Sequence, residues 1–149
     1  MNNSDELLKL GNQLCFPLYA ASRLVTREYQ PHLEKLNITY PQYLVLLILW
    51  EKDGLTVNEI AKKLLLNTNT VTPLLKRMET EGILSRSTTT TDERKVIVKL
   101  SRKGKKLKED ALCIPQQLKA EFMNGPVNSD DLMNLKAILQ KMIVYLSEK

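Results

Sequence analysis

The stretch Thr56–Gly82, TVNEIAKKLLLNTNTVTPLLKRMETEG, decides the fold because it predicts two helices joined by a tight turn. Thr56 and Glu59 form a capping-box pattern, in which each side chain binds a free backbone amide of the other residue, so a helix begins here. Asn67 is an N-cap candidate for a second helix only a few residues later. Gly82 is the left-handed cap expected at the end of that second helix. We therefore expect a helix-turn-helix.

The second helix combines an apolar face with a polar N-terminal end, as a DNA recognition helix requires. Apolar residues recur at helical spacing from Val71 to Met78, and this face is expected to pack on the core. Short polar side chains near the N-terminus suit base edges in the major groove, and cations one turn later suit phosphates. The predicted base contacts are Thr68, Asn69, Thr70 and Thr72, and the predicted phosphate contacts are Lys76 and Arg77. Pro73 implies that the helix either begins late or tolerates a kink.

After Gly82 the apolar period changes from 3.6 to 2, which predicts strands over residues 83–87 and 95–101. The polar tip between them carries Arg94, which we expect to enter a minor groove while Asp92 holds its guanidinium. Arg86 and Lys95 are further expected phosphate contacts. A charged hairpin tip is often only a solvated loop, so this signal is weak alone. Behind two helices, it predicts a winged helix-turn-helix over residues 55–105 of a mainly α chain with a small β-hairpin.

The segments on either side, residues 1–50 and 107–149, are predicted to be mainly dimerisation helices of one domain spanning residues 1–149. Leucines recur at helical spacing from Leu7 to Leu18, and Pro17 predicts a bend beside Cys15. A long helix bent at Pro115 and a last helix capped by Ser129 are expected at the other end. These helices carry more apolar surface than a DNA-binding core needs. A homodimer would bury it, and a two-fold dimer matches palindromic operators.

The distribution of charge favours a polyanionic partner. Residues 56–106 contain 12 Lys and Arg against 5 Asp and Glu, a net +7, whereas the remaining residues contain 10 against 12, a net −2. A basic middle between mildly acidic ends is the electrostatic footprint of a nucleic-acid-binding module. A solvated basic surface is the alternative explanation of the charge taken by itself.

The composition argues against several other classes of protein. No signal-peptide pattern begins the chain, and its longest apolar run, Tyr43–Trp50, is too short to span a bilayer, so we expect a cytoplasmic protein without membrane contact. Two cysteines, Cys15 and Cys113, are too few for a secreted disulfide framework. With His32 as the single histidine, we expect no structural metal, and we expect no cofactor.

Four motifs resemble the MarR family of transcriptional regulators. DERKVIVKLSRKG (Asp92–Gly104) is similar to the family's wing and its exit, and TVTPLLKRMETEGIL (Thr70–Leu84) is similar to its recognition helix. NQLCFPLYAASR (Asn12–Arg23) and LNITYPQYLVLLILWE (Leu36–Glu51) resemble one branch, the organic hydroperoxide resistance repressors. The match covers nearly the whole chain. It implies a bacterial repressor that binds double-stranded operator DNA as a homodimer and is nucleoid-associated when bound.

The resemblance implies that Cys15 is a peroxide sensor, hydrogen-bonded by Tyr29 and Tyr40 of the partner subunit. The chemistry is reasonable, because a thiolate attacks a peroxide oxygen and tyrosine hydroxyls favour the thiolate. An organic hydroperoxide would be the inducer. From position alone, a small core hydrophobe is the commoner role for such a cysteine.

Oxidised Cys15 needs a second thiol to form a disulfide. Two-cysteine members of the branch close an intersubunit disulfide, but their second cysteine lies farther toward the C-terminus than Cys113. We therefore favour a mixed disulfide with a low-molecular-weight thiol over Cys113 as the resolving thiol. Either product is expected to reposition the two recognition helices so that they no longer fit the operator.

Three other functions compete with this one. The chain is alternatively a MarR-type repressor released by a phenolic or drug-like ligand. A thiol peroxidase built on Cys15 is disfavoured, because no thioredoxin-like βαβ pattern accompanies the cysteine, so we expect no enzyme. A non-specific architectural DNA binder is the third alternative.

Overall fold

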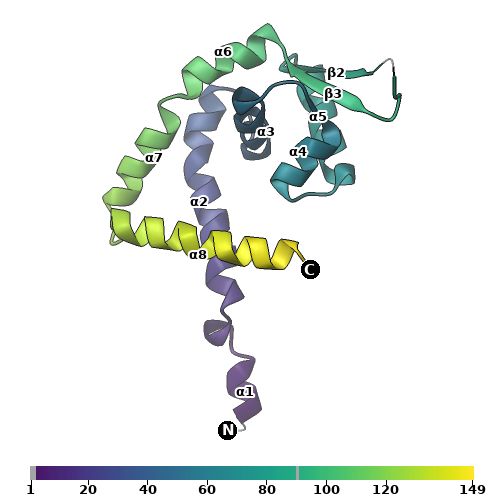
Figure 1. The fold of residues 1–149 in the computed structure, drawn as a ribbon. Helices are drawn as coiled ribbons and strands as arrows, with labels where there is room; N and C mark the ends of the chain where they lie inside the picture. Colours follow the sequence, from purple (N-terminus) through teal and green to yellow (C-terminus); the bar gives the residue numbers. More distant parts are fainter. Residues whose placement is uncertain (1–2, 90) are drawn as a thin grey trace. The chain divides into compact units, whose positions relative to one another are not determined.

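The computed structural model describes residues 3–89 and 91–149 (Figure 1). The chain divides into two compact units, Met1–Tyr40 and Pro41–Lys149. The first unit contains α1 (Asn3–Leu7), the single-turn 3-10 helix η1 (Leu10–Asn12) and α2 (Cys15–Lys35). The elements that follow are α3 (Tyr40–Glu51), β1 (Leu55–Thr56), α4 (Val57–Leu64), α5 (Thr68–Thr80), β2 (Leu84–Thr88), β3 (Val96–Leu100), α6 (Arg102–Ala111), α7 (Ile114–Met123) and α8 (Ser129–Ser147).

The N-terminal segment is interrupted just before Cys15. The sequence predicted a continuous helix bent at Pro17, but α2 begins at Cys15 and Pro17 is its third residue. A proline in a first helical turn removes an N–H that has no helical partner, so it begins a helix without bending it. Cys15 therefore lies at the start of a 21-residue helix.

The helix-turn-helix predicted from Thr56–Gly82 is confirmed by its caps. The Thr56 hydroxyl accepts from the Glu59 N–H at 3.1 Å, and the Glu59 carboxylate accepts from the Thr56 N–H at 2.7 Å. At the far end Gly82 has φ 75°, and the Ile83 N–H donates to the Met78 carbonyl at 3.0 Å, as in a Schellman cap. Asn67 occupies the N-cap position of α5 without a side-chain cap bond, and α5 runs continuously through Pro73.

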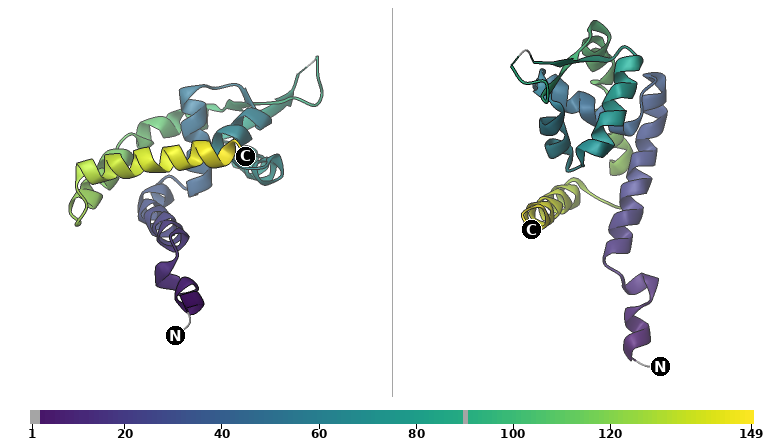
Figure 2. Two further views of the ribbon diagram at one scale, coloured as in Figure 1. Left: turned by 60° about the horizontal axis from the view of Figure 1, so that its bottom comes forward. Right: turned by 90° about the vertical axis from the view of Figure 1, so that its right-hand side faces the viewer.

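The wing belongs to a three-stranded antiparallel sheet in the order β1-β3-β2. The two strands predicted from the alternating pattern are confirmed within one residue at each end, and they pair from Leu84↔Leu100 to Thr88↔Val96. The third strand, β1, pairs Leu55 with Val98 and was not predicted, because two residues give no alternation to recognise. In Figure 2 the β2–β3 hairpin extends beyond the neighbouring helices α4 and α5.

One apolar core holds the elements of the second unit together. Its fully buried apolar side chains come from α3, α4, α5, the residue before β2, β3 and α7: Val45, Leu46, Leu49, Ile60, Val71, Leu75, Met78, Ile83, Val98 and Ile114. The Trp50 indole N–H donates to the Gly104 carbonyl at 2.9 Å. Gly104 lies so close to the Ile83 carbonyl oxygen that a Cβ there would overlap it, so glycine is required for α6 to pack.

The C-terminal helices differ from the sequence expectations in two places. The long helix expected to bend at Pro115 is two helices, α6 and α7. Cys113 occupies the N-cap position of α7 without a side-chain cap bond, and Pro115 lies in the first turn of that helix. The last helix is capped by Asn128, not by Ser129, and Asn128 forms a capping box with Asp131. No described helix combines the length and apolar character that a membrane crossing needs.

Candidate nucleic-acid interface and thiol site

The predicted recognition residues lie together on α5. Thr68, Asn69 and Thr70 form its exposed first turn, Thr72 is half-buried, and Lys76 and Arg77 are exposed one turn later. On the opposite face of α5, Val71, Leu75 and Met78 are buried in the core. The buried face therefore anchors α5 in the core while its polar face is exposed, as a helix that enters a DNA groove requires.

The recognition helix and the wing line the same groove, which has a volume of about 220 Å³. Thr68 and Thr72 line it from α5, and Arg94 and Lys95 line it from the hairpin. Thr56 and Asn58, at the start of α4, form a further side that the sequence analysis missed. The capping box was the signal that could have indicated it, because it marks a helix N-terminus, where backbone N–H groups favour anions.

Arg86 also lines this groove, and its side chain is only 18% exposed. Its backbone N–H donates to the Glu79 carboxylate at 2.7 Å, and its Nε lies 3.6 Å from the same carboxylate. Glu79 was not among the predicted site residues. Through the backbone bond it ties α5 to the wing, while Nε of Arg86 is buried without a hydrogen-bond partner among the described residues.

Asp92 contacts Arg94 in the hairpin tip, although through the main chain. The carboxylate of Asp92 accepts from the Arg94 backbone N–H at 3.0 Å. The Asp92 carbonyl and backbone N–H in turn bind the Thr89 hydroxyl, at 2.8 and 3.0 Å. The contact that we expected from Asp92 to the Arg94 guanidinium is replaced by one that shapes the turn.

Tyr29 and Tyr40 lie side by side, with ring centroids 5.0 Å apart and ring planes inclined by 59°. Both are half-buried. Burial raises the pKa of Tyr29, and burial together with the neighbouring Tyr29 raises the pKa of Tyr40. Both hydroxyls are therefore protonated at neutral pH and able to donate hydrogen bonds.

Cys15 is exposed and lies on the same helix as Tyr29, 14 residues earlier. At the rise of an α-helix this spacing separates the two residues by about 21 Å. Within one chain Tyr29 is therefore far outside hydrogen-bonding distance of the thiol.

Cys113 is also exposed, at the N-cap of α7. Its thiol donates to the Asp110 carbonyl at 3.7 Å. Among the described residues, no three His, Cys, Asp or Glu side chains gather into a metal site.

Comparison with known proteins agrees with this geometry. The family model of the transcriptional regulators SarA/Rot matches residues 27–111. The organic hydroperoxide resistance transcriptional regulator of Bacillus subtilis is 45% identical over 149 residues, or 100% of this chain and 99% of that protein.

Two solved structures of AbfR, a protein of Staphylococcus epidermidis, have the same fold. Reduced AbfR bound to DNA has 34% identity and a TM-score of 0.77, over 96% of this chain and 98% of that one. Disulfide-formed AbfR has 35% identity and a TM-score of 0.63, over 98% and 97%.

The relatives are transcriptional regulators and not enzymes, and they share the winged helix whose recognition residues and basic groove are described above. The chain belongs to the MarR and SarA family of DNA-binding winged-helix regulators, in the branch of the organic hydroperoxide resistance regulators.

Proposed function

We propose that the chain is a homodimeric repressor in the bacterial cytoplasm that releases its operator when an organic hydroperoxide oxidises Cys15. The pairing of Tyr29 with Tyr40 carries this proposal. Protonated phenols are hydrogen-bond donors suited to an anion, yet Tyr29 is about 21 Å along the helix from its own Cys15. A second subunit is the natural source of the thiolate that they bind.

The dimer binds operator DNA through two recognition helices. Thr68, Asn69, Thr70 and Thr72 contact base edges, and Lys76 and Arg77 contact phosphates beside them. The basic groove with Arg86, Arg94 and Lys95 follows the backbone and the minor groove. The exposed apolar side chains of the flanking helices supply the dimer contact. The structure of a relative bound to DNA supports DNA as the partner of this chain.

Oxidation of Cys15 begins at an exposed thiol in the first turn of α2. The thiolate attacks the terminal peroxide oxygen and the O–O bond breaks. The remaining oxygen leaves with the organic group and takes up a proton to become an alcohol. Sulfur is oxidised by two electrons to a sulfenic acid, and the hydroperoxide is reduced.

A low-molecular-weight thiol then completes the switch. Its thiolate attacks the sulfenic sulfur, an S–S bond forms, and the oxygen leaves as water after protonation. Cys113 is the competing thiol within the chain, and its exposure at the start of α7 makes it accessible to the same chemistry. That a relative on this fold has a disulfide-formed structure supports a disulfide as the oxidised state.

A gel shift with cumene hydroperoxide and a small thiol tests the proposal. We expect the reduced protein to bind operator DNA and the oxidised protein to release it. Cys15→Ser should stay bound under both conditions, and Cys113→Ser should still be released if a small thiol resolves the sulfenic acid. Tight binding by wild-type protein whose Cys15 is shown by mass spectrometry to carry the mixed disulfide would contradict the proposal.

Release by a phenolic or drug-like ligand is the second candidate, because one apolar groove of about 260 Å³ lies between α3, α6 and α7. Tyr43, Leu47 and Trp50 line one side of it, and Lys108 lies at its rim. Ligand pockets of proteins begin at about 300 Å³, so the groove suits a small aromatic ring. DNA release by such a ligand under reducing conditions, retained in Cys15→Ser, would favour this candidate.

A further inference from the structure

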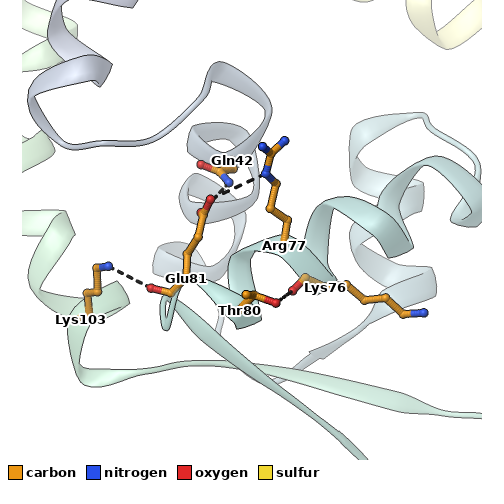
Figure 3. A network of polar contacts seen from close by, with 6 residues as sticks. All are labelled: Gln42, Lys76, Arg77, Thr80, Glu81 and Lys103. Atoms are coloured by element: carbon orange, nitrogen blue, oxygen red, sulfur yellow. Dashed lines mark hydrogen bonds and ion pairs between the residues drawn. The ribbon is translucent and has the colours of Figure 1, made fainter.

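Gln42 is buried, with 2% of its surface exposed, and its side chain reaches the end of the recognition helix. Its amide N–H donates to the Glu81 carboxylate at 2.8 Å, across 39 residues of sequence. Glu81 is the C-cap of α5, and its other carboxylate oxygen lies 3.8 Å from Nε of Arg77. Figure 3 shows the Glu81 side chain lying between Gln42 and Arg77.

We propose that Gln42 and Glu81 are positioning residues that hold the Arg77 guanidinium in the direction of a DNA phosphate. The inference rests on the proposed function, in which Arg77 contacts the DNA backbone. It adds a residue of α3, outside the helix-turn-helix, to the groups that determine DNA affinity.

The argument begins with the weakness of the Arg77–Glu81 pair alone. Arg77 is 74% exposed, and a solvent-exposed pair one helical turn apart contributes little, because both long side chains keep many rotamers. Gln42 strengthens the pair, because its amide, which belongs to α3, holds one oxygen of the Glu81 carboxylate in place. With Glu81 held, the second oxygen has a defined position, and the guanidinium that pairs with it loses part of its freedom before DNA binds.

The end of α5 does not depend on Gln42 for its fold. The Ile83 N–H already binds the Met78 carbonyl at 3.0 Å, and the Lys103 ammonium donates to the Glu81 carbonyl at 2.9 Å. The Glu81 side chain is 38% exposed, so we expect its carboxylate to stay hydrated when Gln42 is changed. Loss of the Gln42 contact is therefore expected to alter the Arg77 side chain more than the helix.

The salt dependence of DNA binding separates a positioning role from a structural one. Each phosphate contact that is lost lowers the slope of log K against log salt by about 0.9. We would measure this slope with the full-length reduced protein on an operator duplex selected in vitro. Arg77→Ala is expected to lower it by about 0.9 per subunit, and Gln42→Met by a large part of that amount. In the double variant Gln42→Met should cause no further loss.

Two further variants complete the experiment. Gln30→Met is the matched control, because Gln30 donates to Glu34 at 2.7 Å in the same chemistry but on α2, and its slope should equal that of the wild type. Glu81→Gln keeps the size of the side chain and removes its charge, so it should lower the slope as Gln42→Met does. If circular dichroism shows that Gln42→Met is unfolded, the slope of Glu81→Gln tests the inference in its place.

A wild-type slope in both Gln42→Met and Glu81→Gln would overturn the inference, as would losses that simply add to that of Arg77→Ala. A wild-type slope in Arg77→Ala itself would show instead that the proposed phosphate contact is wrong, and the inference would fail with it.

Discussion

The winged-helix core and the helices that flank it use similar apolar patterns in opposite ways. In α5, Val71, Leu75 and Met78 recur at helical spacing and are fully buried within the chain. Helix α8 has the same periodicity over 19 residues and buries none of them. Its exposed apolar side chains are Met133, Leu135, Ile138, Met142, Ile143, Val144, Tyr145 and Leu146.

This difference means that periodicity predicts where a helix forms but not what covers its apolar face. The core is completed by its own chain, with caps, sheet pairing and buried side chains. Large exposed apolar faces are rare on monomers, so we expect the face of α8 to be an interaction surface. The same sequence signal thus serves folding in one region and, in our proposal, association in the other.

The largest expected effect is in the core, from Gly104→Ala. The new Cβ would overlap the Ile83 carbonyl oxygen, and a backbone atom cannot move aside as a side chain can. Overpacking of this kind costs about 3 kcal/mol, and urea unfolding would measure it. Gly11→Ala is the matched control, because its Cβ would meet nothing within 4 Å. Equal stability of the two variants would mean that α6 is free to shift away from Ile83.

The next effect is in the flanking helices, from Leu135→Asp. Leu135 is 51% exposed in the single chain, so the core should remain folded. A carboxylate buried in a dimer contact should weaken dimerisation by about 100-fold, which is about 2.7 kcal/mol. Analytical ultracentrifugation would measure it. A Leu135→Asp variant as dimeric as the wild type would place the contact elsewhere.

The sequence predicted the core better than its surroundings for a physical reason. Caps and turns are local, so the Thr56–Glu59 capping box and the Gly82 cap were predicted correctly. Proline has two effects that sequence alone does not separate. Pro17 and Pro115 were expected to bend helices but lie in first turns, whereas Pro73 lies inside a helix that continues.

The candidate site divides in the same way. The polar face of α5 follows from spacing within one helix and was predicted. The contacts from Glu79 to Arg86 and from Gln42 to Glu81 join different elements, so no periodicity indicates them. The roles of Cys15, Tyr29 and Tyr40 came from the resemblance and stay predictions, because the single chain does not contain the contact between subunits.

A smaller effect in the core concerns its capping box. Thr56→Ala should lower the free energy of unfolding by about 1 kcal/mol, the usual loss for an N-cap residue. The backbone hydrogen bond of Thr56 lowers the pKa of Glu59 below 4.5, so its stabilising contribution is present at neutral pH and is lost as pH falls below about 4.5. Urea unfolding between pH 7 and pH 3 should show a smaller acid loss for Glu59→Gln, which has no carboxyl to titrate, than for the wild type. Parallel curves would contradict this assignment.

The smallest expected effect lies in the tyrosine pair of the first unit. Burial raises the pKa of Tyr29 and of Tyr40 above 10.0, so the protonated phenols stabilise the folded chain below pH 10 and this contribution is lost as pH rises through the raised values. Absorbance at 295 nm would follow their ionisation. In Tyr29→Phe the pKa of Tyr40 should fall, because the charge of Tyr29 is one of its causes.

The same titration tests whether a second copy covers these rings. In the proposed dimer the partner's Cys15 segment buries them further and brings a thiolate beside them, and both effects raise a phenol pKa. The wild-type dimer should therefore ionise its paired tyrosines at higher pH than the Leu135→Asp monomer does. Equal midpoints would mean that the pair is covered by its own chain alone. Tyr29 and Tyr40, like the core residues, would then be buried by their own chain, and the Cys15 thiolate would need other hydrogen-bond donors.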